Sequence, residues 1–232
     1  ATVTVGRNLS ATTDDNNGEI NLGTLVVDGT IALATNDDAN DDSAHATIVN
    51  TCSVCSHGLK FAASTVEGNL SATATTGNMI QSGALTIKGT SAITTSANNA
   101  TISLDTTTNA FTGALTITTN DSSSFNSDAT IAAGDSDKLI FAASTIDGNL
   151  VVTSSFVPVD SDSSGTISET ESIGISQTGA LTVLGTSSFT TSADGADINL
   201  DNTSNNLDGT VHVVTNDNSN GDGVYAGNVT LA

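Results

Sequence analysis

The sharpest arrangement of potential metal ligands in the chain lies at residues 160–171, which read DSDSSGTISETE. Side chains with oxygen atoms stand at the first, third and fifth positions, a glycine stands at the sixth, and the twelfth is Glu171. Ca²⁺ takes about six to eight oxygen ligands, and a glycine within a binding loop allows the sharp turn that brings those ligands together. These residue types at this spacing therefore indicate calcium binding.

The segment resembles the calcium loop of EF-hands and dockerins, in which an aliphatic residue stands at the position of Ile167. By that resemblance, the ligands are Asp160, Asp162, Ser164, the carbonyl of Thr166, Ser168 through a water molecule, and Glu171 in bidentate fashion. Extracellular loops of this type bind calcium at about 10⁻⁴ to 10⁻³ M. The alternative interpretation is a solvated acidic loop that bulges from the fold.

Two other acidic segments, residues 37–42 and residues 217–222, could hold further calcium between stacked copies of the chain. Neither segment follows a known loop spacing, and solvated turns are the favoured interpretation of both. If copies do stack, cations between them would offset the repulsion between like charges.

Cys52 and Cys55 form a C-x-x-C pair. Such a pair can be a redox couple, part of a zinc site or a local disulfide. A redox role needs a helix N-terminus that the surrounding sequence does not predict. Zinc would need two more ligands, for which His57 and His45 are the nearby candidates. In an exported protein, we favour a disulfide that closes a lengthened turn.

Catalytic residues are hard to place, and we expect that the chain is not an enzyme. Some polysaccharide lyases and pectinases are β-helices that use Asp clusters, or Arg and Lys beside calcium, on one strand face. Here the Asp residues lie in predicted turns, and the basic residues are scattered: Arg7, Lys60, Lys88 and Lys138. A polysaccharide-active β-helix enzyme is therefore only a minor alternative.

The elements that must position these residues belong to sequence repeats. Residues 61–70, which read FAASTVEGNL, return eighty positions later as FAASTIDGNL at residues 141–150. The phrases that follow return after 96 positions, so sixteen residues are inserted between them: residues 83–87 and 102–105 correspond to residues 179–183 and 198–201. Fixed periods of this kind indicate a solenoid or an array of modules.

The composition narrows the fold class and the range of partners. Aromatic residues make up 3% of the 232 residues and Trp is absent, which suits narrow stacked strands and disfavours a bulky core. The formal net charge of −21 disfavours nucleic acid and anionic membranes as partners. No segment approaches the length of a transmembrane helix, so we expect no membrane insertion. No basic, apolar leader opens the sequence, and we expect that any export signal was removed or lies outside it.

Apolar residues alternate with Thr or Ser in short runs, such as residues 31–33, 102–104 and 198–200, and such alternation predicts half-buried strands. No segment predicts a helix. The all-β candidates are a parallel β-helix and tandem immunoglobulin-like sandwiches. The phrase GALTI at residues 83–87 is echoed at residues 113–117. A stack of rungs echoes itself in this way because every rung meets the same neighbours, so we predict the β-helix, a β-solenoid.

Strings such as residues 109–115, 142–150 and 177–183 resemble the β-strand-repeat segments of filamentous-haemagglutinin-like bacterial surface proteins. The resemblance covers nearly the whole chain. It implies an exported, right-handed parallel β-helix that serves as a stalk, adhesin or fibre at the bacterial cell surface. It carries no catalytic residues over to this chain.

We expect a single β-solenoid of about three degenerate units, residues 1–60, 61–140 and 141–232, with the calcium loop inserted near residues 154–172. Residues 227–232 align with residues 128–133, and no polar cap is predicted at either end of the solenoid. An open rung exposes unpaired N–H and C=O groups, and a heterologous contact that does not close produces a filament.

These observations predict a structural subunit of an extracellular surface fibre or matrix filament, a homopolymer that assembles head to tail and is stabilised by calcium. The alternative is a stalk segment of a large adhesin that binds a host or neighbouring cell, with cell-surface or matrix glycans or proteins as partners. A fragment of a longer chain, cut at a repeat boundary, is also kept open.

Overall fold

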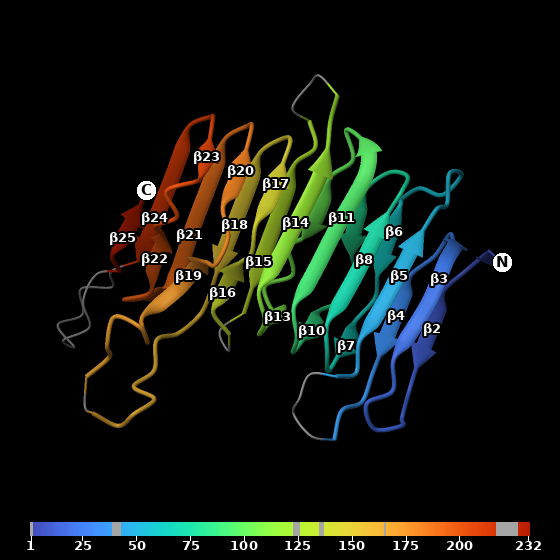
Figure 1. Cartoon of the computed structure of the whole chain (residues 1–232), viewed down its shortest axis with the longest axis horizontal. Coiled ribbons are helices and arrows are strands. Elements are labelled where there is room, and N and C mark those ends of the chain that lie inside the picture. The colour runs from blue at the N-terminus through green and yellow to red at the C-terminus, as the bar shows by residue number, and fades with distance from the viewer. Residues whose placement is uncertain (1, 39–42, 123–125, 135–136, 165, 217–226) are drawn as a thin grey trace.

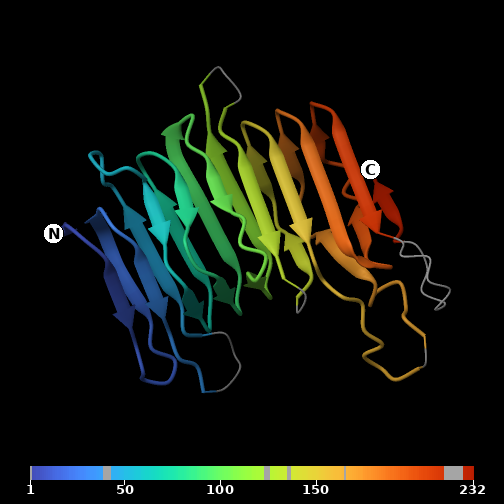
Figure 2. The same ribbon diagram turned by 180° about the vertical axis from the view of Figure 1, so that it is seen from behind.

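The protein folds into an all-β solenoid of about eight turns, built from two parallel sheets that face each other (Figures 1 and 2). The structure is a computed structural model that describes residues 2–38, 43–122, 126–134, 137–164, 166–216 and 227–232. The described residues form 25 strands and no helix. The prediction of a β-solenoid is therefore confirmed, and the tandem sandwiches are excluded because every strand pairing is parallel.

The chain passes from one sheet to the other at each half-turn, and in six half-turns two short consecutive strands, such as β6 and β7, lie in the same sheet. The 13-stranded sheet comprises β1 (Val3–Val5), β3 (Ile20–Val27), β5 (Ala46–Asn50), β8 (Leu70–Ala74), β11 (Ser91–Asn98), β14 (Leu115–Asn120), β16 (Leu139–Phe141), β17 (Ser144–Ile146), β19 (Ile173–Gln177), β20 (Leu181–Val183), β22 (Asp197–Leu200), β23 (Asn206–Leu207) and β25 (Val229–Leu231). The 12-stranded sheet comprises β2 (Leu9–Thr12), β4 (Ile31–Ala34), β6 (Leu59–Phe61), β7 (Ser64–Val66), β9 (Met79–Gln81), β10 (Leu85–Ile87), β12 (Ile102–Leu104), β13 (Ala110–Phe111), β15 (Ala129–Ala133), β18 (Leu150–Ser154), β21 (Ser187–Asp194) and β24 (Val211–Asn216).

One turn of the solenoid advances the chain by 21 to 24 residues in its regular part. Ala46 pairs with Leu70, Leu70 pairs with Ser91, and Ser91 pairs with Leu115 in adjacent strands of one sheet. Side chains of a strand point alternately inward and outward, so residues two apart enter the core. Leu70, for example, is buried while its neighbour Ser71 is exposed. The two sheets therefore enclose one apolar core that runs the length of the solenoid.

Small and branched side chains fill most of the core between the two facing sheets. Most of its members are Ala, Val, Ile and Leu, and the largest fully buried side chains are Phe61, Phe111, Phe141 and Phe189. Burial of one Val, Ile, Leu or Phe side chain stabilises the fold by roughly 1.5–3 kcal/mol. The low aromatic content of the sequence agrees with this core.

Buried amide side chains tie successive turns together. The Asn109 side chain exchanges hydrogen bonds with Gln81, at 2.9 and 3.0 Å, and accepts the N–H of Leu85 at 2.9 Å. It also donates to the carbonyl of Ala132 at 3.1 Å, in the opposite direction along the solenoid. The arrangement is repeated 96 residues later between Gln177 and Asn205.

The sequence repeats do not return to the same sheet. Residues 61–70 place β6 and β7 in the 12-stranded sheet, whereas their copy at residues 141–150 places β16 and β17 in the 13-stranded sheet. The same exchange separates β10 from its copy β20. Each repeat therefore spans an odd number of half-turns, and the two sheets accept the same sequence. Strands β6 and β16 run across the expected unit boundaries at residues 60/61 and 140/141, where the solenoid is continuous.

The sixteen inserted residues lengthen one turn of the solenoid. Ala129 of β15 pairs with Leu150 of β18, 21 residues on, whereas Leu150 pairs with Ser187 of β21, 37 residues on. The difference of 16 residues falls in the connection between β18 and β19, which projects outward from one side of the solenoid (Figures 1 and 2). This connection contains the acidic segment at residues 160–171.

Candidate functional site

The candidate calcium loop is held at both ends by the solenoid. Strand β18 precedes it and β19 follows it, so strands flank the loop where EF-hands have helices. The Lys138 ammonium, on the preceding turn, donates to the carbonyl of Thr170. The Ser172 hydroxyl donates to a carboxylate oxygen of Asp197, on the following turn. The loop therefore starts and ends at fixed points although most of its residues are exposed.

Three carboxylates converge within the loop. One oxygen each of Asp160, Asp162 and Glu171 lies within 4.8 Å of the other two. Asp160 and Glu171 are half-buried, whereas Asp162 is exposed. Separations of this size allow one cation to contact all three groups, because calcium–oxygen distances are about 2.3–2.6 Å.

The first half of the loop is organised around the backbone N–H of Ser164. This N–H donates to Oδ1 of Asp160 at 3.1 Å and to Oδ1 of Asp162 at 2.9 Å. The backbone and side-chain hydrogen bonds from Ser164, and a further one with Asp160, lower the pKa of Asp162. Both carboxylates are thus directed to the inside of the turn, where Ser163 has a positive φ of 58°.

Glu171 closes the loop by accepting four hydrogen bonds. Its Oε1 accepts the hydroxyl of Ser161 at 2.5 Å and the N–H of Ser161 at 2.7 Å. Its Oε2 accepts the N–H of Ser168 at 2.9 Å and the hydroxyl of Ser168 at 2.8 Å. These bonds, led by that of the Ser161 hydroxyl, lower the pKa of Glu171 to about 2. The second and last residues of the predicted loop are therefore joined.

The other predicted ligands, Ser164, the carbonyl of Thr166 and Ser168, are hydrogen-bonded within the loop. The Ser164 hydroxyl donates to the carbonyl of Thr166 at 3.0 Å, and the Ser168 hydroxyl donates to Oε2 of Glu171 at 2.8 Å. Gly165 lies outside the described residues. Ile167 is 39% exposed. Sequence reasoning missed Ser161, because hydroxyl side chains between alternate ligand positions carry no signal in the loop pattern.

The two other acidic segments lie largely outside the described residues, which exclude residues 39–42 and 217–226. Of the first segment, Asp38 accepts a hydrogen bond from the amide of Asn16 at 3.0 Å. That contact joins two turns of the solenoid and is the kind expected of a solvated turn.

Cys52 and Cys55 are joined by a disulfide, with a Cα–Cα distance of 5.5 Å. The bond lies in the connection between β5 and β6. Its sulfur atoms cannot serve as zinc-binding thiolates while they are bonded to each other. Nδ1 of His45, one of the candidate zinc ligands, instead accepts the N–H of Asn69 at 2.9 Å.

The two ends of the described solenoid form a second candidate site. Val229 and Leu231 of β25 pair with Ile198 and Leu200, both buried, so their side chains point to the core side, yet they are 45% and 47% exposed. Val3 of β1, at the opposite end, is 51% exposed. Among the described residues, each edge thus presents apolar core positions together with one side of a strand that has no pairing partner.

The strand register corrects one expected alignment. Val229 pairs with Ile198, and Ala129 pairs with Ile102, the sequence copy of Ile198. Val229 therefore corresponds to Ala129, and the alignment of residues 227–232 with 128–133 is wrong by one residue. A slip of one residue would turn every core-facing side chain of β25 outward.

No helix in the described part of the chain is long and apolar enough to span a bilayer.

The fold and its periodic strands define a β-solenoid repeat protein. A family model described as repeats of unknown function (DUF5649) matches residues 49–118 and 159–214, and the chain belongs to this family. The two matches end at Thr118 in β14 and at Val214 in β24. These positions are equivalent, because β14 pairs with Ser91 through Leu115, and β24 pairs through Val211 with Ser187, the copy of Ser91 that lies 96 residues later. No curated protein and no solved structure matches the chain.

Proposed function

We propose that the protein is a structural subunit of an extracellular surface fibre, in which copies join head to tail through the edges of the solenoid and calcium binds at residues 160–171. A repeat β-solenoid is compatible with a structural or adhesin-like role. The observation that carries the proposal is the pair of edges, where core-facing side chains such as Val3 and Val229 are about half exposed.

An edge of this kind favours association with another edge. Unpaired N–H and C=O groups of an edge strand form a template for further strands, and stable monomeric solenoids cover their terminal rungs with polar caps. The two edges differ, so their contact is heterologous and leaves a free edge at each end of the assembly. Repetition of that contact builds a fibre.

Charge and cysteine chemistry support an extracellular place of work. Disulfides such as Cys52–Cys55 persist in oxidising compartments. With a formal net charge of −21, copies repel one another, and divalent cations offset that repulsion. Extracellular calcium is abundant enough for a loop that binds at about 10⁻⁴ to 10⁻³ M.

Electron microscopy of the purified 232-residue chain tests the fibre. In millimolar calcium we expect long fibres, and we expect Val229→Asp to reduce them to short rods. Val151→Asp is the matched control, because Val151 is 41% exposed on the outward face of β18, which is paired on both sides within the solenoid. Short rods for the unmodified chain at all calcium and protein concentrations would contradict the proposal.

Calorimetric titration tests the calcium loop. We expect calcium to bind the unmodified chain, and we expect the affinity to fall at least tenfold in Asp160→Ala and Glu171→Ala. Asp105→Ala removes an exposed carboxylate far from the loop in sequence and serves as the control. Equal affinities in all four proteins would exclude residues 160–171 as the binding site.

A second candidate function is a stalk segment within a large adhesin. It is favoured by the family match, because a model of repeats that matches twice is typical of longer arrays. On this alternative, cell-surface or matrix glycans or proteins are partners of other segments. The purified chain then remains a short rod in the same micrographs, with and without chelator.

A further inference from the structure

We propose that successive copies in the fibre are rotated by half a turn, so that the 13-stranded sheet of one copy continues as the 12-stranded sheet of the next. In this joint, which rests on the proposed head-to-tail function, β24 pairs with β1 of the following copy and β25 pairs with β2.

The two sheets contain different numbers of layers. In the 13-stranded sheet, β17, β20 and β23 lie beside β16, β19 and β22 in the same layers, which leaves ten layers. In the 12-stranded sheet, β7, β10 and β13 lie beside β6, β9 and β12, which leaves nine. Both β1 and β25 belong to the sheet with ten.

This difference decides between the two ways of stacking. If like sheets were joined, the 12-stranded sheet would lack one layer, about 4.8 Å, at every joint. Alternating the sheets removes the gap. Each continuous sheet of the fibre then receives ten layers from one copy and nine layers from the next. The sheets can be exchanged, since copies of one phrase form β6 and β7 in one sheet and β16 and β17 in the other.

The same junction already occurs twice inside the chain. Ala34 of β4 pairs with Thr65 of β7, and the following β5 pairs with β8 through Ala46 and Leu70. Eighty or so residues later, β14 pairs with β17, and β15 pairs with β18. In sequence and register, β24 and β25 correspond to β14 and β15, whereas β1 and β2 correspond to β17 and β18. The edges are therefore the two halves of a third junction.

The internal junctions also give the register of the joint. Thr118 pairs with Thr145, and Thr130 pairs with Val151. Transferred to the edges by the same equivalence, Val214 pairs with Thr4 of the following copy, and Thr230 pairs with Ser10. The core-facing Val229 and Leu231 then meet Leu9 and Ala11, as their buried equivalents Ala129 and Ile131 meet Leu150 and Val152.

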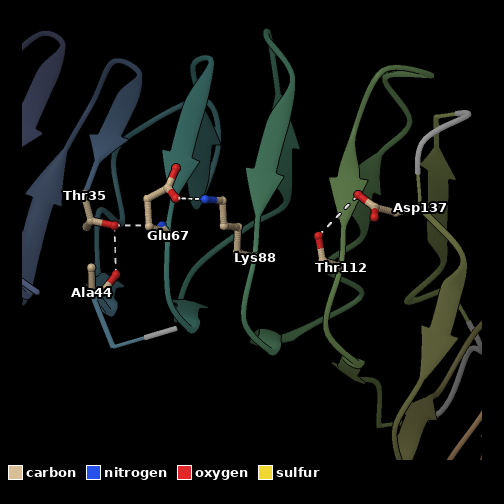
Figure 3. Close-up of polar contacts among 6 residues, drawn as sticks. All are labelled: Thr35, Ala44, Glu67, Lys88, Thr112 and Asp137. Carbon is tan, nitrogen blue, oxygen red and sulfur yellow. Dashed lines mark hydrogen bonds and ion pairs between the residues drawn. The ribbon is translucent and has the colours of Figure 1, made fainter. Parts of the chain in front are cut away.

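A threonine stands at the corner of each junction and joins one turn to the next. The hydroxyl of Thr35 donates to the carbonyl of Ala44 at 2.8 Å and accepts the N–H of Glu67, on the next turn, at 2.9 Å (Figure 3). Thr119 makes the same pair of bonds. Thr215 makes the first of them, to the carbonyl of Gly227 at 3.0 Å.

The half-turn joint supplies the second bond of Thr215. Gly6 of the following copy occupies the position of Glu67 and Asp147, so its N–H reaches the Thr215 hydroxyl. Side chains at the next corner agree with this pairing. His45 accepts the N–H of Asn69, and Asp128 accepts the N–H of Asn149. Asn228 occupies the equivalent position at the edge and would accept the N–H of Asn8.

Engineered disulfides test the joint. Neighbouring strands place paired Cα atoms about 4.8 Å apart, within the range of disulfides. We expect mild oxidation of fibres to give a ladder of covalent oligomers for Val214→Cys combined with Thr4→Cys, and for Thr230→Cys combined with Ser10→Cys. These four residues face outward, so the substitutions leave the core unchanged.

The control recombines the same four substitutions. Thr230→Cys with Thr4→Cys is the pair that would meet if like sheets were joined, whereas the missing layer would keep Val214→Cys and Ser10→Cys apart in that arrangement. We expect no ladder from either combination. A ladder from these control pairs, or fibres without a ladder from the expected pairs, overturns the half-turn joint but leaves the fibre standing. Absence of fibres from the unmodified chain overturns the proposed function and the joint with it.

Discussion

Single side chains at the corners of the coil hold one turn to the next. Asn69 Oδ1 accepts the N–H of Thr90 at 2.7 Å, and Asn149 Oδ1 accepts the N–H of Thr186 at 2.8 Å. Aspartate and histidine take the same role at Asp128 and His45. The position requires an acceptor atom one residue before a strand rather than a particular residue type, which is why the sequence repeats are degenerate there.

This requirement predicts the effect of changes at His45. His45→Ala leaves the half-buried N–H of Asn69 without its partner and should reduce the free energy of unfolding by about 1–3 kcal/mol. His45→Asp restores the acceptor found at Asp128 and should be less destabilising. Urea unfolding at a fixed, low protein concentration measures both variants. Equal losses for alanine and aspartate would contradict the role of the acceptor.

Glu171 predicts an acid-sensitive loop. Its pKa is lowered from 4.5 to about 2, so the hydrogen bonds of its carboxylate stabilise the loop fully above pH 4.5 and are lost as the pH falls toward 2. The amide NMR signals of Ser161 and Ser168 should shift across that window. Glu171→Gln should abolish the transition. Signals of Ser161 and Ser168 that do not change between about pH 5 and pH 2 would contradict this account.

At the scale of strands, the sequence predicts that a segment forms a strand better than it predicts the sheet in which that strand lies. The alternation of residues 102–104 and 198–200 correctly predicts strands. The sequence repeats correctly predict a solenoid. The exchange of sheets between β6 and β16 could not be predicted, because both sheets bury the same alternating pattern. The convergence of the three carboxylates in the acidic loop could be predicted from their spacing in the sequence. The contact of Ser161 with Glu171 could not, because it depends on how the chain folds back on itself.

Close packing of corners predicts which glycines can be replaced. A Cβ atom at Gly83 would lie 2.5 Å from the backbone nitrogen and 2.9 Å from Cα of Ala63, on the turn below. Gly83→Ala should therefore cost about 1–3 kcal/mol, since the backbone of Ala63 has to move. Gly6→Ala is the control, because nothing lies within 4 Å of a Cβ atom built at Gly6. The equivalent position of another turn accepts a side chain, that of Glu67.

Urea unfolding of dilute protein compares the two glycine variants. Gly6→Ala should unfold within about 0.5 kcal/mol of the unmodified chain, or be slightly more stable, because alanine reduces the entropy of the unfolded state. A loss for Gly6→Ala as large as that for Gly83→Ala would show that the corners are not packed as described.

Across the whole molecule, stability should decrease from the middle of the solenoid to its edges. Each turn contacts only its neighbours, so a central strand such as β11 is held by β8 and β14, whereas the described edge strands β1 and β25 have one partner each. Fraying of such edges exposes their amides at little cost in free energy. The fibre joint should remove this gradient, because both edges gain a second neighbour.

Hydrogen exchange measured by mass spectrometry tests the gradient and its loss together. In dilute protein with chelator, peptides that contain Val3–Val5 or Val229–Leu231 should exchange much faster than peptides from Ser91–Asn98. In fibres, the edge peptides should slow toward the rate of the central strand, while the exposed loop at residues 160–171 changes only with calcium. Edge peptides that exchange equally fast in fibres and in dilute protein would show that the fibres are held by another surface, since pairing of β24 and β25 with β1 and β2 has to protect backbone N–H groups at both edges.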